Sequence, residues 1–204
     1  MRETLGYKKN HEDREENDFY ATDPNEVYNI CSYEKLIGTV LEPSCGMGHM
    51  VKGIQKHKAY ENIKIVATDL IDRGFGESGY NFLDYNYPYV NDIGTIIMNP
   101  PFKFIEEFVV KSIEIAQHKV ILLARNQFLE GGGRYNNIFS KTPPARIYQY
   151  VDRIACAKDG NFKRNMISNM AFSWFIWDKD TYDGNTYMKW IRKFKDNDNC
   201  VNLF

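Results

Sequence analysis

The sequence has few cysteines and no long apolar run. Its 204 residues include four cysteines, which stand far apart without a Cys-x-x-Cys pair, and four scattered histidines. Because zinc and disulfide frameworks need closely patterned cysteine or histidine, we expect reduced thiols and no metal site. No apolar segment approaches the ~20 residues of a membrane span, and residues 1–5 lack the apolar stretch of a signal peptide. These absences predict a cytoplasmic protein with no membrane partner.

The sequence also lacks the overall positive charge of many nucleic-acid-binding proteins, since its formal net charge is −1. The charge is unevenly distributed, however. Residues 131–170 contain seven lysine and arginine residues against two aspartates, a formal charge of +5. Such a local excess is the usual signature of phosphate binding, although a solvated surface face accounts for it equally well. Aromatic residues make up 15% of the chain; most fit core packing, and some are able to stack on purine rings.

Up to residue 124, short apolar strands alternate with helices. Strands are expected at residues 39–42, 63–69, 95–99 and 120–124. Helices are expected at residues 24–36, 50–58 and 104–118. Because parallel strands need helical crossovers, this alternation predicts a doubly wound, mostly parallel α/β sheet of the Rossmann-like type, covered on both faces.

After residue 125 the pattern changes. Three consecutive glycines within residues 130–134 argue against regular structure there, and two prolines at 143–144 mark another break. We expect two strands and then a C-terminal helix, at residues 146–155, 170–177 and 186–195. The chain is therefore predicted to form one domain over residues 18–204, preceded by a polar N-terminal arm over residues 1–17.

Residues 42–48, Glu-Pro-Ser-Cys-Gly-Met-Gly, follow a predicted strand and precede a predicted helix. Glycines let the backbone pass close to a ligand, and such turns lie at the ligand-binding edge of open α/β sheets. Asp69 ends the next strand, at the spacing of an acid that holds ribose hydroxyls. The loop is neither a Gly-x-Gly-x-x-Gly fingerprint nor a P-loop, which disfavours a plain dinucleotide fold. A structural glycine turn and a helix-capping role for Asp69 are the alternatives.

Residues 99–102, Asn-Pro-Pro-Phe, follow the strand predicted at 95–99. The two prolines remove two backbone donors and leave carbonyl acceptors. Asn99 adds a side-chain acceptor, and Phe102 adds an aromatic face. Together these groups can hold a planar amino group by its two hydrogens while its ring stacks on the aromatic side chain. A rigid strand terminator is the alternative interpretation.

With these motifs in this order, the sequence resembles the N6-adenine DNA methyltransferase family over about residues 18–178. The resemblance is to the small stand-alone type often encoded by phages and mobile elements, with cofactor motifs before the catalytic motif as in the gamma class. It implies a seven-stranded class I methyltransferase fold and S-adenosylmethionine as the cofactor. It also implies N6 of adenine in double-stranded DNA as the target, in the cytoplasm of a bacterium or a phage-infected cell.

The resemblance assigns roles to individual residues. The catalytic candidates are Asn99, Pro100, Pro101 and Phe102. The cofactor-binding candidates are Tyr20, Thr22, Glu42, Pro43, Ser44, Cys45, Gly46, Gly48, Asp69, Leu70, Asn81, Phe82, Asp84 and Asn99. Among these, residues 18–24 would line the methionine end, Glu42 would hold the amino group and Asp69 the ribose. Where the family often has Asp-Phe-Leu this sequence has Asn81-Phe82-Leu83, so either Asn81 or Asp84 would face the adenine of the cofactor.

A large recognition domain is absent, so residues 131–170 are expected to act as a small DNA-recognition insert. Its DNA-binding candidates are Arg134, Arg153, Lys163 and Arg164. The Asn-Pro-Pro-aromatic motif specifies an amine but not the molecule that carries it. The alternatives are therefore an RNA adenine or guanine amino methyltransferase, a protein glutamine N5-methyltransferase, and a catalytically silent module that binds S-adenosylmethionine or DNA.

Overall fold

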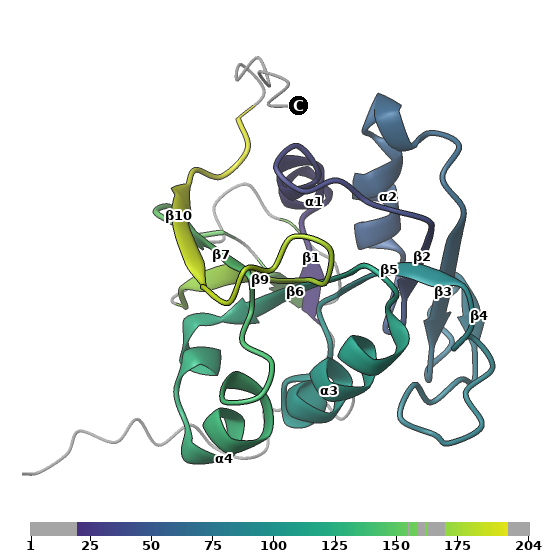
Figure 1. The fold of residues 1–204 in the computed structure, drawn as a ribbon. Coiled ribbons are helices and arrows are strands. Elements are labelled where there is room, and N and C mark those ends of the chain that lie inside the picture. Colours follow the sequence, from purple (N-terminus) through teal and green to yellow (C-terminus); the bar gives the residue numbers. More distant parts are fainter. Residues whose placement is uncertain (1–19, 155, 159–161, 163–169, 196–204) are drawn as a thin grey trace, which may run out of the picture.

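An eight-stranded sheet forms the centre of the molecule (Figure 1). The computed structural model describes residues 20–154, 156–158, 162 and 170–195. The strand order is β10-β7-β9-β6-β5-β2-β3-β4, and only β9 runs against its neighbours β6 and β7. The predicted α/β class and mostly parallel sheet are confirmed. The predicted number of seven strands is wrong, because the sheet has eight.

The sheet strands are β2 (Thr39–Glu42), β3 (Ile65–Asp69), β4 (Glu77–Ser78), β5 (Ile93–Met98), β6 (Lys119–Arg125), β7 (Arg146–Tyr150), β9 (Phe172–Asp178) and β10 (Tyr187–Ile191). The helices are α1 (Pro24–Cys31), α2 (His49–Gln55), α3 (Ile105–Ile115) and α4 (Gly132–Arg134). Single 3₁₀ turns occupy Lys58–Tyr60, Phe102–Phe104 and Asn126–Leu129, and a π-helical turn occupies Tyr135–Phe139. Outside the main sheet, β1 (Tyr20–Thr22) pairs antiparallel with β8 (Cys156–Lys158).

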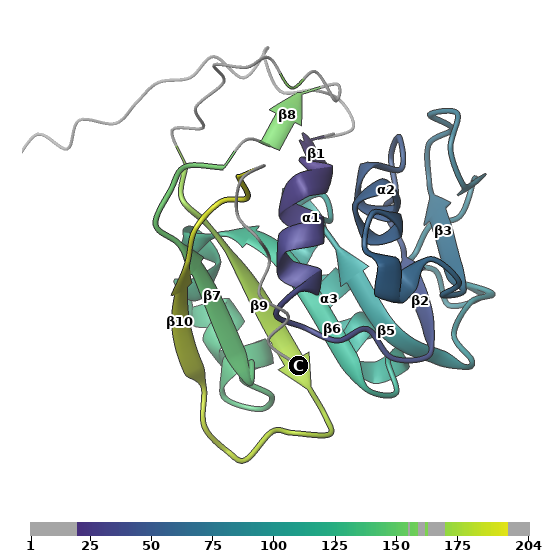
Figure 2. The same ribbon diagram turned by 90° about the horizontal axis from the view of Figure 1, so that it is seen from above.

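Helices cover both faces of the sheet, α1 and α2 on one and α3 and α4 on the other (Figures 1 and 2). Successive side chains of a strand point to opposite faces of the sheet, so one strand contributes to the apolar core on each face. On β5, Ile97 packs with Val27 of α1, whereas Ile96 packs with Val109 of α3. Strands that are buried on both faces read as continuous apolar runs, which is why β5 and β6 were recognisable from the sequence.

The order of strands has a switch point at β2. From β2 the chain goes first to β3 on one side and later to β5 on the other, so β2 lies between these two strands. In open α/β sheets the crossovers on the two sides of such a point leave a crevice at the carboxyl ends of the strands. The loops that follow β2, β3 and β5 therefore share one edge of the molecule.

The C-terminal helix predicted at residues 186–195 is wrong, because this segment contains β10. It pairs parallel with β7, with Tyr187 opposite Arg146 and Ile191 opposite Tyr150. Aromatic and β-branched residues favour strands, and a strand at the sheet edge gains backbone pairing without burying its side chains. Of its five residues only Ile191 is buried, so the strand carries no alternating apolar pattern that would have revealed it.

The prediction that residues 130–134 have no regular structure is also corrected. The chain enters α4 after Gly131, which has a φ of 120°, and continues into the π-helical turn. The Arg134 side chain holds this turn, since it donates to the Glu106 carboxylate at 3.1 Å and to the carbonyls of Gln127 and Glu130. Long-range pairing with α3 thus offsets the low helix propensity of glycine.

Part of the segment 131–170 belongs to the main sheet. Its middle part, β7, is an interior strand of the main sheet, with β10 on one side and β9 on the other. The strand predicted over residues 146–155 ends at Tyr150. Arg146, which contributed to the +5 charge, is bound to Glu34 at 2.5 Å and to Asp178. Among the described residues of this segment, α4, its π-helical turn and β8 lie outside the main sheet.

The pH dependence of stability should reveal the buried carboxyl group of Glu26 on α1. Burial raises the pKa of this group from 4.5 to about 7, although hydrogen bonds from Tyr150 and the Phe194 backbone act in the opposite direction. Because the folded protein holds this proton more tightly than the unfolded chain, the free energy of unfolding should fall as the pH rises from 4.5 to 7. The expected fall is roughly 3 kcal/mol.

Glu26→Gln should remove most of this fall. Urea unfolding of both proteins at pH 5 and pH 8 measures the difference. An equal loss of stability with pH in the variant and the parent would contradict the assignment to Glu26.

Candidate active site

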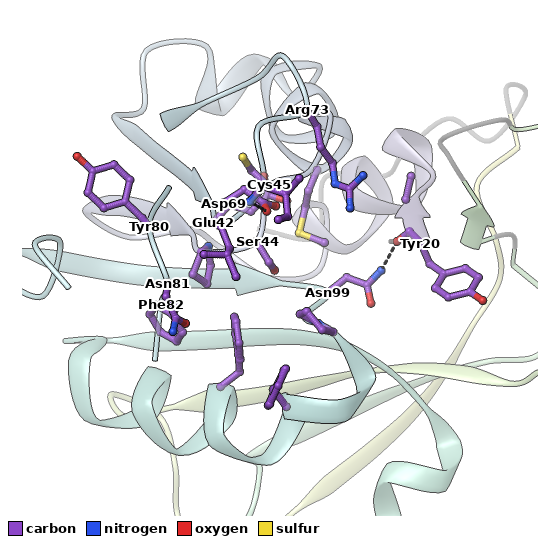
Figure 3. A pocket seen from close by; sticks show the side chains of 18 of the residues that line it. Tyr20, Glu42, Ser44, Cys45, Asp69, Arg73, Tyr80, Asn81, Phe82 and Asn99 are labelled. Carbon is purple, nitrogen blue, oxygen red and sulfur yellow. Dashed lines mark hydrogen bonds between the residues drawn. The ribbon is translucent and has the colours of Figure 1, made fainter. Parts of the chain in front are cut away.

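One cavity of about 350 Å³ lies at the switch-point edge, where β2, β3 and β5 end. Its volume is within the range of small-molecule sites. The predicted residues in its wall are Tyr20, Thr22, Glu42, Pro43, Ser44, Cys45, Asp69, Leu70, Asn81, Phe82, Asn99 and Pro101. The predicted residues outside this wall are Gly46, Gly48, Asp84, Pro100 and Phe102. Figure 3 shows side chains from the loops after β2, β3 and β5 converging on the cavity.

The loop after β2 is shaped by its glycines. Gly48 has a φ of 73°, and a Cβ atom there would lie 2.5 Å from the Phe75 ring. The Gly46 N–H donates to Asp69 Oδ2 at 2.8 Å, and the Cys45 N–H donates to the Thr68 carbonyl at 2.9 Å. These contacts draw the loop against the end of β3, so the two glycines act on the shape of the cavity even though they do not line it.

Three buried polar atoms in the cavity wall have no hydrogen-bond partner among the described residues. They are Glu42 Oε2, Ser44 Oγ and His49 Nδ1. Buried polar atoms are nearly always paired in folded proteins, so three orphans around one cavity indicate a polar ligand. His49 was not predicted from the sequence. Its position directly after the Gly-Met-Gly turn, where α2 begins, is the signal that could have found it.

The negative charge of Asp69, at the end of β3, acts on Glu42 at the end of β2 and on Cys45. Burial, and then the negative charge of Asp69, raise the pKa of Glu42 well above its ordinary value. Burial, Glu42 and Asp69 likewise raise the pKa of the Cys45 thiol to about 12, so Cys45 stays a neutral thiol rather than a nucleophile. The Val51 backbone bonds the Glu42 carboxyl group, so a ligand that donates a hydrogen bond or carries positive charge would meet the remaining unpaired atom, Oε2.

Asn99 follows β5 and turns its amide toward β1. Its Nδ2 donates to the Tyr20 carbonyl at 2.8 Å (Figure 3) and to the Thr22 hydroxyl oxygen at 3.1 Å. A backbone carbonyl can only accept, so the amide nitrogen has to face β1. The carbonyl oxygen Oδ1 is thereby left as an acceptor on the other side of the amide, in a side chain that lines the cavity.

Phe102 lines a second, smaller cavity. This cavity of about 190 Å³ is lined by Phe102, Ile105, Arg125, Gln127, Phe128 and Arg134. The Arg125 guanidinium lies 3.7 Å from the centre of the Phe102 ring, and the Tyr20 ring centre lies 5.6 Å from it. The aromatic side chain of the tetrapeptide thus lines a different cavity from Asn99.

Asn81 and Asp84, the two candidates for the residue that faces the adenine of the cofactor, occupy different positions. Asn81 lines the cavity, whereas Asp84 is exposed and outside its wall. Asp84 Oδ1 accepts a hydrogen bond from Asn81 Nδ2 at 2.8 Å, and Asn81 Oδ1 accepts one from the Leu83 N–H at 3.1 Å. Asp84 therefore acts on the cavity only through Asn81. Sequence reasoning missed Ile71 and Arg73, in the loop after β3, and Tyr80, just beyond β4. Their position shortly after Asp69 was the available signal.

The predicted DNA-binding residues are not gathered in one described place. Arg134 is half-buried and pairs with Glu106, which leaves little of its charge for a phosphate. Arg153 is exposed, just beyond β7. Lys163 and Arg164 lie outside the described residues. In the described part of the chain, no group of three or more histidine, cysteine, aspartate or glutamate side chains could hold a metal ion, and none of the helices could cross a membrane.

No protein-family model and no curated protein sequence matches this chain. Solved structures do match it. The methyltransferase subunit of a type I restriction-modification system from Streptococcus thermophilus superposes with a TM-score of 0.63 at 10% identity, over 86% of this chain and 48% of that one. The M protein of the type I restriction enzyme EcoKI gives 0.60 at 12% identity, over 89% and 51%.

A third match is a protein from Listeria monocytogenes assigned to the class I S-adenosylmethionine-dependent methyltransferases. It superposes with a TM-score of 0.58 at 12% identity, over 83% of this chain and 65% of that one. The fold is that of the class I methyltransferases. At these identities the likeness establishes the fold alone, and the chain spans about half the length of the restriction subunits that it matches.

Proposed function

We propose that this protein is an S-adenosylmethionine-dependent methyltransferase that modifies the exocyclic amino group of adenine in double-stranded DNA. The observation that carries the proposal is the orientation of Asn99. Its amide oxygen is presented as an acceptor beside a ligand-sized cavity, directly before two prolines and an aromatic residue. An acceptor at this place suits a planar amino group and has no evident use in a silent binding module.

The cavity fits the proposed cofactor. Glu42 and Ser44 carry buried polar atoms without partners, which suits the amino and carboxyl groups of the methionine part. Asp69 ends β3 at the mouth of the same cavity and would accept from the ribose hydroxyls. The Phe82 and Leu83 side chains add apolar wall beside Asn81, as the adenine part requires. When bound, S-adenosylmethionine supplies a methyl group activated by its sulfonium.

Asp69→Ala should weaken binding of S-adenosylmethionine about 10- to 100-fold, the loss expected for a charge-assisted hydrogen bond of roughly 1.5–3 kcal/mol. Calorimetric titration measures it. Asp72→Asn is the matched control, because Asp72 is exposed, three residues further along, and outside the cavity wall. The same affinity in the Asp69 variant and the parent would show that Asp69 only holds the loop through Gly46.

The residues of the tetrapeptide would position the target amine. Asn99 Oδ1 and a carbonyl of the proline pair would accept its two hydrogens, which draws the nitrogen lone pair out of conjugation with the ring. Phe102 would support the base by stacking. The neutral Cys45 thiol takes no part as a nucleophile, so the contribution of the protein is positioning and electrostatics.

Double-stranded DNA is proposed as the carrier of the amine for two reasons. The Streptococcus thermophilus and EcoKI proteins, whose fold this chain shares, belong to restriction-modification systems. The segment beyond Tyr150 also holds three of the four predicted DNA-binding residues, Arg153, Lys163 and Arg164. An adenine inside a duplex cannot reach Asn99, so the base would have to flip out of the stack, as it does for other enzymes that modify bases.

The experiment is methyl transfer from labelled S-adenosylmethionine to unmethylated duplex DNA, to RNA of the same sequence and to protein extract. Nucleoside analysis of the product identifies the modified atom. N6-methyladenine from the duplex DNA arm is the expected result. Label in RNA or in glutamine would replace the proposal by one of its alternatives, and binding of the cofactor without label in any arm would favour a silent module.

A further inference from the structure

The strand β1 holds the Asn99 amide through two acceptors. The Tyr20 carbonyl and the Thr22 hydroxyl oxygen both accept from Asn99 Nδ2, although they lie 79 and 77 residues away in the chain. Thr22 is 3% exposed and lines the cavity. An asparagine amide can rotate by half a turn with almost no change in shape, and the rotated form would present a donor where the oxygen now stands.

We propose that Thr22 is a positioning residue, whose hydroxyl oxygen keeps the Asn99 amide in the orientation that presents Oδ1 to the target amine. The inference rests on the proposed function and extends it from Asn99 to the strand that orients Asn99. The Tyr20 carbonyl can only accept, so it turns the amide nitrogen toward β1. The Thr22 hydroxyl oxygen is a second acceptor for the same nitrogen, at 3.1 Å, and adds to the hold on this orientation.

The position of Thr22 depends on a segment far along the chain. Antiparallel pairing sets Tyr20 opposite Lys158, Ala21 opposite Ala157 and Thr22 opposite Cys156. β8 therefore fixes the register of β1 against the tetrapeptide. β8 lies between Arg153 and Lys163 in the chain, so the strand that pairs with β1 belongs to the same stretch of sequence as the residues proposed to meet DNA.

The test compares Thr22→Val, which keeps the shape and removes the hydroxyl, with Thr22→Ser, which keeps the hydroxyl. Thr22→Val should lower kcat about 3- to 10-fold, the worth of one hydrogen bond, with unchanged KM for DNA. Because Thr22 lines the cavity, the affinity for S-adenosylmethionine is measured on the same variant and should fall less than kcat. Thr22→Ser should restore kcat to near the parent value. Equal losses in both variants would mean that Thr22 acts by packing, and a change confined to cofactor affinity would make it a cofactor ligand instead.

A second measurement does not depend on activity. The side-chain amide resonances of Asn99 in ¹⁵N-labelled protein can be assigned by their absence in Asn99→Ala. Thr22→Val should shift them and speed their exchange with solvent, whereas Thr22→Ser should leave them in place. Unshifted resonances in Thr22→Val would overturn the inference. If these resonances shift but the parent protein methylates nothing, the positioning inference stands and the proposed function fails.

Discussion

Asn99→Ala should lower the rate of methyl transfer about 10²- to 10³-fold, the loss found when a positioned polar catalytic contact is removed. The reason is geometric. The Asn99 amide is oriented by β1, and its oxygen is the side-chain acceptor that the tetrapeptide offers to the amine. Single-turnover transfer from labelled S-adenosylmethionine measures the chemical step, and calorimetry on the same protein should show that the cofactor still binds.

Asn185→Ala is the matched control, because Asn185 lies exposed in the loop before β10, far from the cavity wall. It should leave the rate unchanged. If Asn99→Ala methylates DNA at nearly the rate of the parent protein, the tetrapeptide is a strand terminator and the proposed catalytic role is lost. A loss of cofactor binding equal to the loss of rate would instead assign Asn99 to the cofactor.

Glu34→Ala should lower the free energy of unfolding by about 3–5 kcal/mol, the cost of breaking a buried ion pair. Glu34 is 2% exposed and accepts from Lys119 at 2.7 Å, Arg146 at 2.5 Å and Tyr148 at 2.8 Å. Burial opposes its ionisation, but the hydrogen bond from Arg146 and the charge of Lys119 outweigh burial and lower the pKa of Glu34. Its removal leaves Lys119 buried with only Asp178 at 3.3 Å as a counter-charge.

Urea unfolding measures this loss, and two further variants keep the result interpretable. Asp180→Ala removes the exposed partner of His118 and should cost less than ~1 kcal/mol. The double variant Glu34→Leu/Lys119→Met replaces both members of the buried pair by apolar groups and should be more stable than Glu34→Ala. A Glu34→Ala protein as stable as Asp180→Ala would show that the ion pairs of Glu34 with Lys119 and Arg146 contribute no more to the free energy of unfolding than an exposed surface pair does.

Ion pairs within the fold also explain why the charge pattern of residues 131–170 was only partly informative. Composition treats Arg134 and Arg146 as free surface cations. In the fold, Arg146 bonds Glu34 across 112 positions of sequence and Arg134 bonds Glu106 across 28. Which cations remain for a phosphate depends on partners that approach only after the sheet has formed, so the count of charges overstated the patch.

Strand β10 was missed for a related reason. A strand is recognised from sequence by alternating burial or by a fully apolar run, and the burial of β10 follows neither pattern because only Ile191 is covered. Its pairing partner β7 lies about forty positions earlier. The helix predicted over residues 186–195 was expected only as the last element of the fold, with no burial pattern behind it.

The local motifs, in contrast, could be placed from the sequence alone. Residues 42–48 and residues 99–102 are each continuous in the chain, and each directly follows a strand that is recognisable by its buried apolar residues. Since parallel strands share a carboxyl edge, it followed that Glu42, Asp69 and Asn99 would meet at one end of the sheet. All three line the same cavity.

What the sequence determined by itself is therefore the parallel α/β core and the loops that its strands carry to one edge, because both follow from consecutive residues and from strand direction. Only the tertiary structure decided which atoms at that edge are left without partners and how they point. Asn81 rather than Asp84 faces the cavity, and the orientation of the Asn99 amide is set by Tyr20 and Thr22. These outcomes depend on contacts between distant segments, which no local pattern of residues encodes.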